Sequence, residues 1–417
     1  MASRRALVVG GSLGGLLAAH LLRGTGWEVV VFERNAEDLT GRGAGLGTHP
    51  QLIDVLRRIG IDFDESMGVK IDNLTFLDRH GRFYLEVETA RIMSSWGRLY
   101  RSLRDPLPPE SYQLGMGLVR VEQDAASVTA VFADGTRVAG DLLVGADGGR
   151  STVREQFLPE VEAEYAGYVA WRAMLDEREV PPDIHAEIFE RFTICLPDGE
   201  LFLAYPVPGR NNEAQRGRRA YNIVWYRPAE PERILPDLCT DASGKRHDDG
   251  IPPPLIRPDV VATIKDTARA LVAPQVAEIL ARTKQPFFQP IVDLVSPQLT
   301  FGRVALLGDA AFVARPHVGA GVTKAALDAV SLAEALVDAD VPDGLARYER
   351  EQQPFGRAIV ALGRAQEGAH LSAQLKPLDQ RTTAERKWDE QALVDAHLMR
   401  SENLRKVLMT ARTEARA

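Results

Sequence analysis

The feature that most constrains the fold is a glycine-rich loop between an apolar strand and an apolar helix at the start of the chain. Residues 6–10 predict a buried strand, and residues 13–23 predict a helix that ends before Gly24. Residues 28–33 predict a second strand, which completes a βαβ unit. The loop of such a unit directs backbone N–H groups toward a bound pyrophosphate. The start of the chain therefore predicts a Rossmann-like dinucleotide-binding unit.

The loop itself follows the GxGxxG fingerprint with one departure, because Ser12 replaces the middle glycine. A serine side chain is small and can itself hydrogen-bond a phosphate. An acidic residue ends the second strand, where a carboxylate takes the ribose hydroxyls of a dinucleotide. The alternative is a structural glycine turn in another kind of α/β protein. The residues expected to bind the cofactor here are Gly10, Ser12, Leu13, Gly15, Glu33 and Arg34.

A second glycine-rich loop lies near the other end of the chain. Residues 307–311 read Leu-Gly-Asp-Ala-Ala, and residues 316–321 read Pro-His-Val-Gly-Ala-Gly. A nicotinamide enzyme needs only the first loop. A chain that also closes a late Gly-Asp loop over the same ligand indicates a longer dinucleotide, for which FAD is the obvious candidate.

Length, charge and cysteine content narrow the class of protein. The chain has 417 residues, which predicts two to three domains, and its net charge of −8 gives no support for nucleic-acid binding. Cys195 and Cys239 show no metal-ligand spacing, so we expect reduced thiols in a cytoplasmic protein and no metal site. Arg4 and Arg5 resemble a twin-arginine export signal, but glycines interrupt the following apolar run. No stretch approaches the ~18–20 apolar residues that cross a membrane.

The rest of the chain predicts an α/β fold in which a Rossmann-like FAD-binding domain is interrupted by an antiparallel-sheet substrate domain and followed by C-terminal helices. Residues 165–227 contain aromatic-rich runs typical of strands. Residues 240–258 predict an exposed connection, and helical patterns follow at 258–283, 345–372 and 380–415. The expected parts are 1–72, 95–160 and 286–345 for the FAD-binding domain, 73–94 and 161–285 for the substrate domain, and 346–417 for the C-terminal helical region.

Two further segments resemble motifs of a known family. Residues 141–154, which read DLLVGADGGRSTVR, resemble the DG motif of single-component FAD-dependent aromatic hydroxylases, and residues 308–311 resemble their GD motif. Segments 165–172, 204–210 and 315–317 are similar to the hydroxypyridine hydroxylases of that family. The resemblance implies a fold of the para-hydroxybenzoate hydroxylase type. The chain departs from the family at Phe312, where a histidine is usual, and at Thr323, where an asparagine is usual.

The resemblance also implies which further residues hold FAD. It assigns Asp309 to the ribityl hydroxyls and Asp147 to the ordering of the FAD loop beside the nicotinamide route, with Arg150 and Arg154 as structural residues around it. Arg101 matches an arginine that contacts FAD, although a solvated helix charge is the alternative. Backbone contacts to the flavin are implied for the stretch 43–47, with Gly45, Leu46 and Gly47, and for Gly319, Ala320 and Gly321.

The same resemblance points to candidates for catalysis and substrate binding. His317 follows Pro316, whose carbonyl lies near the reacting ring in the family, and an imidazole there could accept a phenolic proton as general base. His49 is the second candidate, and simple packing is its alternative. The aromatic-rich strands offer walls and polar contacts for a ring, and the alternative for each aromatic residue is the core or a dimer contact. The substrate-binding residues expected are Tyr168, Arg172, Tyr205 and Trp225.

The reaction implied is the hydroxylation of an electron-rich ring, hydroxypyridine-like or phenolic, through a flavin C4a-hydroperoxide. NADH or NADPH would be a transient reductant, because no separate nicotinamide-binding Rossmann unit is visible. The expected partners are O₂ and a small aromatic substrate, with no nucleic acid and no membrane, and association into a homodimer is left open. Two alternatives also stay open: a flavin oxidase or dehydrogenase of a small molecule, and a non-catalytic flavin- or ligand-binding protein.

Overall fold

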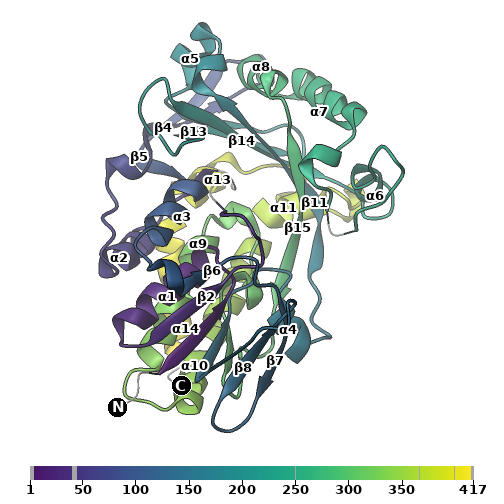
Figure 1. Ribbon diagram of the computed structural model, residues 1–417. Helices are drawn as coiled ribbons and strands as arrows, with labels where there is room; N and C mark the ends of the chain where they lie inside the picture. The colour runs from purple at the N-terminus through teal and green to yellow at the C-terminus, as the bar shows by residue number, and fades with distance from the viewer. Residues whose placement is uncertain (1–3, 40–44, 249, 366, 399, 415–417) are drawn as a thin grey trace.

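The computed structural model describes residues 4–39, 45–248, 250–365, 367–398 and 400–414 and builds them around two large sheets. Figure 1 shows a smaller sheet in the lower half of the molecule and a larger sheet in the upper half, with helices packed around both. The chain passes between the two sheets several times, so that each sheet is assembled from segments distant in the sequence. The α/β fold predicted from the sequence is confirmed.

The lower sheet has six strands in the order β16-β17-β10-β1-β2-β6. Its strands pair in parallel, except that β16 pairs antiparallel with β17 at one edge. Helix α1 (Leu13–Gly24) packs against α9 (Gly321–Ala335), which brings the first and the late glycine loops to the same side. The strands are β1 (Arg5–Val9), β2 (Glu28–Phe32), β6 (Tyr112–Gln113), β10 (Leu142–Gly145), β16 (Thr300–Phe301) and β17 (Val304–Leu306).

Two glycines of the first loop are required by close backbone approaches. Gly10 has a φ of 111°, and a Cβ there would lie 2.2 Å from the carbonyl oxygen of Ala146. A Cβ on Gly15 would lie 1.9 Å from the carbonyl oxygen of Gly10. Any larger side chain would therefore push the loop away from β10 or away from the start of α1.

The upper sheet has nine strands in the order β18-β15-β11-β14-β13-β12-β4-β5-β3. Its pairs are antiparallel apart from the parallel pair of β12 with β4. The strands are β3 (Gly45–Gly47), β4 (Val69–Leu77), β5 (Phe83–Ser95), β11 (Glu164–Asp176), β12 (Phe192–Cys195), β13 (Leu201–Pro208), β14 (Arg219–Pro228), β15 (Phe287–Val295) and β18 (Phe312–Val313). Strand β4 begins at Val69, before the boundary predicted at residue 73. The predicted domain boundaries remain a proposal.

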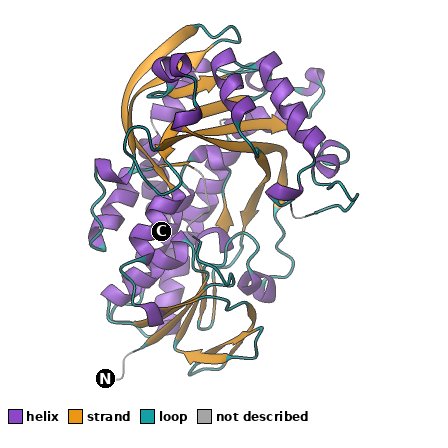
Figure 2. Cartoon of the chain, turned by 45° about the horizontal axis from the view of Figure 1, so that its top comes forward, coloured by secondary structure: helices purple, strands orange, loops and turns teal. Residues whose placement is uncertain are grey.

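Each face of the upper sheet carries its own core. Helices α5 (Pro182–Ile188), α7 (Pro258–Leu271) and α8 (Pro274–Arg282) cover the outer face, as Figure 2 shows at the top of the molecule. The inner face turns toward the lower sheet and carries a separate set of buried side chains. Successive residues of a strand point to opposite faces, so neighbouring positions on β11 or β14 belong to different cores.

The remaining elements surround this frame. Helix α10 (Val341–Arg364) packs against α9 and α14. A small sheet joins β7 (Leu118–Gln123), β8 (Val128–Phe132) and β9 (Arg137–Gly140). The other helices are α2 (Pro50–Arg58), α3 (Trp96–Arg104), α4 (Thr152–Phe157), α6 (Ile234–Leu238), α11 (Glu367–Ala373), α12 (Thr383–Arg386), α13 (Glu390–Leu398) and α14 (Arg400–Glu414).

Two expectations for the middle of the chain need correction. The helical region 258–283 is two helices, because Pro274 starts α8 and its ring cannot continue α7. The connection 240–258 is not fully exposed, since Ile251 and Ile256 are buried beside Cys239 in the outer core. Its polar composition hid these two anchoring side chains.

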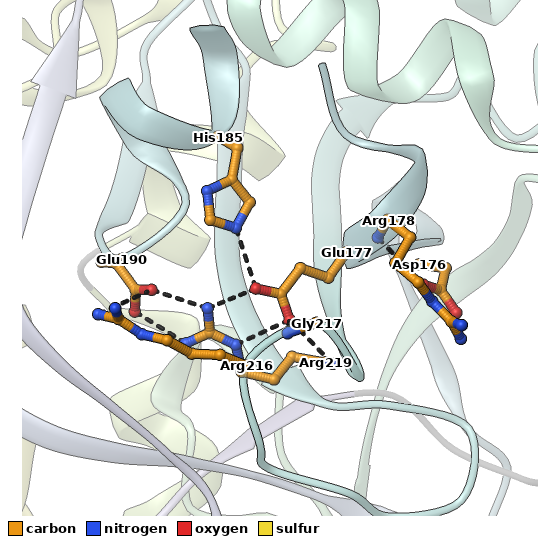
Figure 3. Close-up of polar contacts among 8 residues, drawn as sticks. All are labelled: Asp176, Glu177, Arg178, His185, Glu190, Arg216, Gly217 and Arg219. Atoms are coloured by element: carbon orange, nitrogen blue, oxygen red, sulfur yellow. Dashed lines mark hydrogen bonds and ion pairs between the residues drawn. The ribbon is translucent and has the colours of Figure 1, made fainter. Parts of the chain in front are cut away.

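A buried ion-pair cluster fixes the connection between β13 and β14 (Figure 3). Arg219 lies 2.6 Å from Glu177 and 2.7 Å from Glu190, and Glu177 also accepts the backbone N–H of Gly217 at 2.7 Å. Burial raises the pKa of Glu177, but hydrogen bonds from Arg219 and His185 outweigh it and lower the pKa to about 2. None of these residues lines the cavities described below, so we interpret the cluster as structural.

Within the part of the chain that the structure describes, no helix combines the length and apolar character needed to span a membrane.

Candidate functional site

Two cavities lie at the loops that the sequence singled out. The larger has a volume of about 760 Å³ and lies between the inner face of the upper sheet and the late loop. The smaller has a volume of about 500 Å³ and lies at the first glycine loop. Predicted residues that line the larger cavity are Gly45, Leu46, Gly47, His49, Arg172, Tyr205, Asp309, Pro316, His317, Gly319 and Gly321. Those that line the smaller are Gly10, Ser12, Glu33, Arg34 and Asp147.

The smaller cavity has an acidic wall at the end of β2. Glu33 is buried, and its carboxylate accepts the backbone N–H of Gly11 at 3.0 Å and that of Asn35 at 2.9 Å. Leu13 and Gly15 lie beneath the loop rather than in the wall, where they pack α1 against the sheet. The glycine loop and the end of β2 therefore meet at one carboxylate.

Residues 147–154 of the DG segment are joined to the late loop by a hydrogen bond. The Ser151 hydroxyl donates to Asp147, and Val153 donates its backbone N–H to the same carboxylate at 3.2 Å. Arg154 donates to the carbonyl of Gly149 at 2.6 Å and to that of Ala310 at 3.1 Å, which joins this segment to the late loop. Burial raises the pKa of Asp147.

The late loop exposes one carboxylate to the larger cavity. The Asp309 side chain is exposed to the cavity, and it makes no hydrogen bond or ion pair with the described residues. The protein around the loop limits the hydration of this carboxylate and raises the pKa of Asp309, while the ammonium of Lys324 opposes that rise. A carboxylate that faces a cavity without a protein partner is open to a hydrogen-bonding ligand.

The rim beside the late loop is held by backbone contacts. His49 is buried, and its Nε2–H donates to the carbonyl of Gly319 at 3.0 Å. Gly319 has a φ of 68°, the left-handed region that favours glycine, and Ala320 is buried at the start of α9. A Cβ on Gly45 would lie 2.6 Å from Val207 of β13, so β3 packs closely against that strand of the same sheet. Positions 43 and 44 of the predicted stretch lie outside the described residues.

His317 has a defined neighbour at the inner end of the larger cavity. Its Nε2 lies 3.1 Å from the hydroxyl of Tyr168, which is itself fully buried. The guanidinium of Arg315 lies over the Tyr168 ring at 5.7 Å and pairs with Asp293 at 2.8 Å. This chain of contacts holds the imidazole in place from behind.

Side-chain alternation decides which residues of the upper sheet reach the cavity. Arg172, Tyr205 and Tyr226 point inward and line it. Trp225 points to the outer face and is fully buried among the residues of that core. Its side chain therefore does not face the cavity where a substrate contact was predicted. The same alternation sends Trp171 outward. Tyr168 belongs to the inner core, but it lies behind His317 and does not line the cavity.

Arg101 lies away from both cavities. It borders a separate surface hollow that it shares with Arg98 and Asn212. The α3 residue that lines the smaller cavity is Trp96, whose ring stacks on Tyr100 at 4.9 Å. In the sequence, Trp96 is marked only by its place at the start of a helix.

The residues present fit the expected FAD. The glycine cradle leaves no room for a Cβ, as a close pyrophosphate approach requires. The unpartnered Asp309 carboxylate matches the hydroxyl donors of a ribityl chain. The larger cavity has room for a flavin ring system beside a small aromatic molecule. Groups of three or more His, Cys, Asp or Glu placed to hold a metal ion are absent from the described residues.

Comparisons with family models agree with this arrangement. Residues 165–293 match an FAD binding domain-like family, and residues 260–362 match an FAD binding domain family. Residues 8–51 match a NAD(P)-binding Rossmann-like domain, in accord with the βαβ unit predicted at the start of the chain.

Relatives and solved structures give the same picture. The chain is 34% identical over 358 residues to 2,6-dihydroxypyridine 3-monooxygenase of Paenarthrobacter nicotinovorans, a match that covers 85% of this chain and 89% of that protein. It is 28% identical to an FAD-dependent urate hydroxylase of Klebsiella pneumoniae, over 86% of this chain and 88% of that one. The solved structure of 2,6-dihydroxypyridine-3-hydroxylase from Arthrobacter nicotinovorans superposes with a TM-score of 0.80 at 32% identity, covering 88% of this chain and 93% of that chain.

Proposed function

The chain belongs to the family of single-component FAD-dependent aromatic monooxygenases, and from that premise we propose that its substrate is an anionic, hydroxypyridine-like ring. The family assignment confirms FAD as cofactor, NADH or NADPH as reductant and a small aromatic substrate. The relatives support neither alternative, the flavin oxidase or the binding protein without turnover. The proposal concerns the identity of the ring, the residues that bind it and the residue that acts as base.

The observation that carries the proposal is an arginine without a partner in the cavity wall. Arg172 is half-buried on β11, and it forms no hydrogen bond or ion pair with the described residues. Its Nε is buried and unsatisfied. A guanidinium binds an oxyanion through two parallel hydrogen bonds, which satisfies its donors and orients the anion. A ring that carries a negatively charged oxygen meets both requirements.

The relatives supply independent support for a nitrogen heterocycle. Two of them are named for reactions on dihydroxypyridine and on urate. Both rings carry oxygen substituents beside ring nitrogens, so both present acidic O–H or N–H groups. An arginine that receives the resulting anion and a histidine that accepts a proton suit this chemistry.

Each residue near the larger cavity then has a proposed role. When bound, FAD takes a hydride from NADH or NADPH and supplies the activated oxygen. Arg172 orients the anionic ring, while Tyr205 and Tyr226 form its walls. His317 accepts the proton of the ring hydroxyl, and the Tyr168 hydroxyl, 3.1 Å from Nε2, holds the imidazole. A ring that has lost its proton is richer in electrons at the carbon that receives oxygen.

The other candidate residues have proposed roles around FAD. Asp309 would bind the ribityl chain, and Glu33 with Arg34 would bind the adenosine end. Because His49 Nε2–H already donates to Gly319, we propose a positioning role for His49 beside its candidacy as a base. A cytoplasmic location and a homodimer also remain part of the proposal.

The proposal predicts that binding of the ring increases the rate at which the reductant is oxidised. NADH or NADPH oxidation should rise many-fold when a hydroxypyridine binds, since a site that activates oxygen without a ring wastes reductant. The measurement is reductant consumption across hydroxypyridines, hydroxybenzoates and neutral methoxy analogues, with the product identified by mass. A rate that no ring changes, with no oxygenated product, would contradict the proposal.

Removing the unpartnered guanidinium should weaken substrate binding selectively. For Arg172→Met we expect KM for an anionic ring to rise about 10- to 100-fold, the range for losing hydrogen bonds to a charged group. The KM for a neutral analogue should change little, and Arg172→Lys should lie between. Arg178→Met, which removes an exposed arginine just beyond β11, is the matched control and should leave KM unchanged. Equal losses for neutral and anionic rings would remove Arg172 from substrate recognition.

A further inference from the structure

The first glycine loop carries a glycine, Gly11, at a position where its fingerprint allows any residue. The φ of Gly11 lies outside the left-handed region, so its backbone conformation does not require a glycine. A Cβ at this position would lie 2.2 Å from the hydroxyl oxygen of Tyr112 and 2.8 Å from the Cβ of Glu33. The closest approach is therefore that of the Tyr112 hydroxyl, which occupies the space that a larger residue would need.

Tyr112 holds the carbonyl group of Gly11. It is buried in β6, the edge strand of the lower sheet beside β2 (Figure 1). Its hydroxyl donates to the Gly11 carbonyl oxygen at 3.0 Å and is the one donor to that carbonyl among the described residues. The guanidinium of Arg104 lies over the Tyr112 ring at 4.2 Å, and the hydroxyl of Tyr100 lies 3.1 Å from that of Tyr112. These two contacts fix the phenol that holds the loop.

The direction of this carbonyl determines the direction of the next N–H group. The carbonyl of Gly11 and the N–H of Ser12 belong to one trans peptide group, in which they point in opposite directions. Because the carbonyl points to Tyr112, the N–H of Ser12 points away from Tyr112. Ser12 lines the smaller cavity, whereas Tyr112 does not. On the other side of Gly11, the backbone N–H is held by Glu33 at 3.0 Å, so side chains orient both peptide groups of this residue.

Ser12 has hydrogen-bonding capacity left for a ligand. It is the N-cap of α1, but its side chain makes no capping hydrogen bond, and its backbone N–H has no partner among the described residues. N–H groups at the start of a helix bind anions. We propose that Tyr112 is a positioning residue for FAD, whose hydroxyl holds the Gly11 carbonyl so that the N–H of Ser12 donates to the pyrophosphate of the cofactor. The inference concerns FAD binding and is independent of the ring substrate.

The test removes a single hydroxyl from the full-length protein. Tyr112→Phe keeps the buried ring beneath Arg104 but leaves the Gly11 carbonyl without its donor, so the peptide group is free to turn. We expect the Kd for FAD, from flavin fluorescence at equilibrium, to rise about 10-fold, the scale for leaving one buried polar group unpaired. Tyr100→Phe, the matched control, removes the neighbouring hydroxyl, which contacts Tyr112 and Asp38 but not the loop, and should leave this Kd unchanged. Equal Kd values for the two variants would overturn the proposal.

Two fragments of the cofactor separate pyrophosphate positioning from a general loss of structure. ADP carries the pyrophosphate and adenosine does not, and the affinity of each follows from its displacement of FAD. In Tyr112→Phe the affinity for ADP should fall about 10-fold, as it does for FAD, because both lose the same oriented N–H. The affinity for adenosine should stay unchanged, since Glu33 and Arg34 are intact. Equal losses for ADP and adenosine would contradict the assigned role, and circular dichroism of the FAD-free variants checks that they remain folded.

Discussion

Replacement of His317 by alanine should lower ring hydroxylation by about 10²-fold, the usual scale for losing a positioned general base. FAD binding should persist, because Asp309 and Glu33 are unchanged and the flavin contacts expected from residues 319–321 are made by backbone atoms. Flavin reduction by NADH or NADPH should change little, since hydride transfer does not use the proton of the ring. Hydrogen peroxide release should rise as hydroxylation falls, because oxygen is then activated beside a ring that has kept its proton. Product yield per reductant, measured with peroxide, gives the coupling.

Two comparisons make this result specific to the base. Raising the pH toward the pKa of the substrate should partly restore coupling, because solvent then supplies the deprotonated ring. Tyr168→Phe removes the hydroxyl that lies 3.1 Å from Nε2 and should cause a smaller loss than His317→Ala. His247→Ala, which removes a histidine paired with Asp241 outside both cavities, should be neutral. Normal coupling in His317→Ala at neutral pH would exclude His317 as the base and direct attention to His49.

The FAD end of the site could be predicted from the sequence because its signals are local. A strand, a glycine loop and a helix in succession determine where backbone N–H groups point, and Gly10 and Gly15 are required by contacts within that same unit. The late loop needs a partner 300 positions away, but its glycines and Asp309 mark it by composition. Parallel pairing of β1, β10 and β17 then brings the loops together at one edge of the lower sheet.

The residues that form the substrate wall are harder to predict from the sequence, because aromatic content alone does not give the register of a strand. Period-2 alternation would have separated Arg172 and Tyr226, which face the cavity, from Trp171 and Trp225, which face the outer core. The sequence does contain that alternation. The alternation does not say which face of the sheet meets the late loop, because that depends on how the two sheets pack.

Long-range electrostatic contacts were beyond the sequence altogether. Lys324 is spaced as an ordinary residue of an amphipathic helix, and only the packing of α9 against the late loop buries it beside Asp328. Arg101 shows the reverse case, since family resemblance favoured a cofactor contact while the helix turns its side chain to a surface hollow. The role of a charged side chain can therefore be assigned only when the groups around it are known.

Replacement of Asp309 by alanine should release FAD from a protein that stays folded. The protein as purified should be yellow with non-covalent FAD, and Asp309 is the proposed acceptor for its ribityl hydroxyls. Loss of hydrogen bonds to a charged acceptor predicts a rise of about 10²-fold or more in the Kd for FAD. The ratio of flavin to protein absorbance after gel filtration measures the loss.

The folded state should tolerate this change, which separates it from simple unfolding. Asp309 makes no hydrogen bond within the described residues, and its removal leaves Lys324 paired with Asp328, a neutral combination. We therefore expect the FAD-free variant to melt no earlier than the FAD-free parent, while added FAD raises the Tm of the parent alone. Glu334→Ala, which removes an exposed carboxylate of α9, should retain FAD in full. Full FAD occupancy in Asp309→Ala would instead mean that the late loop does not hold the ribityl chain.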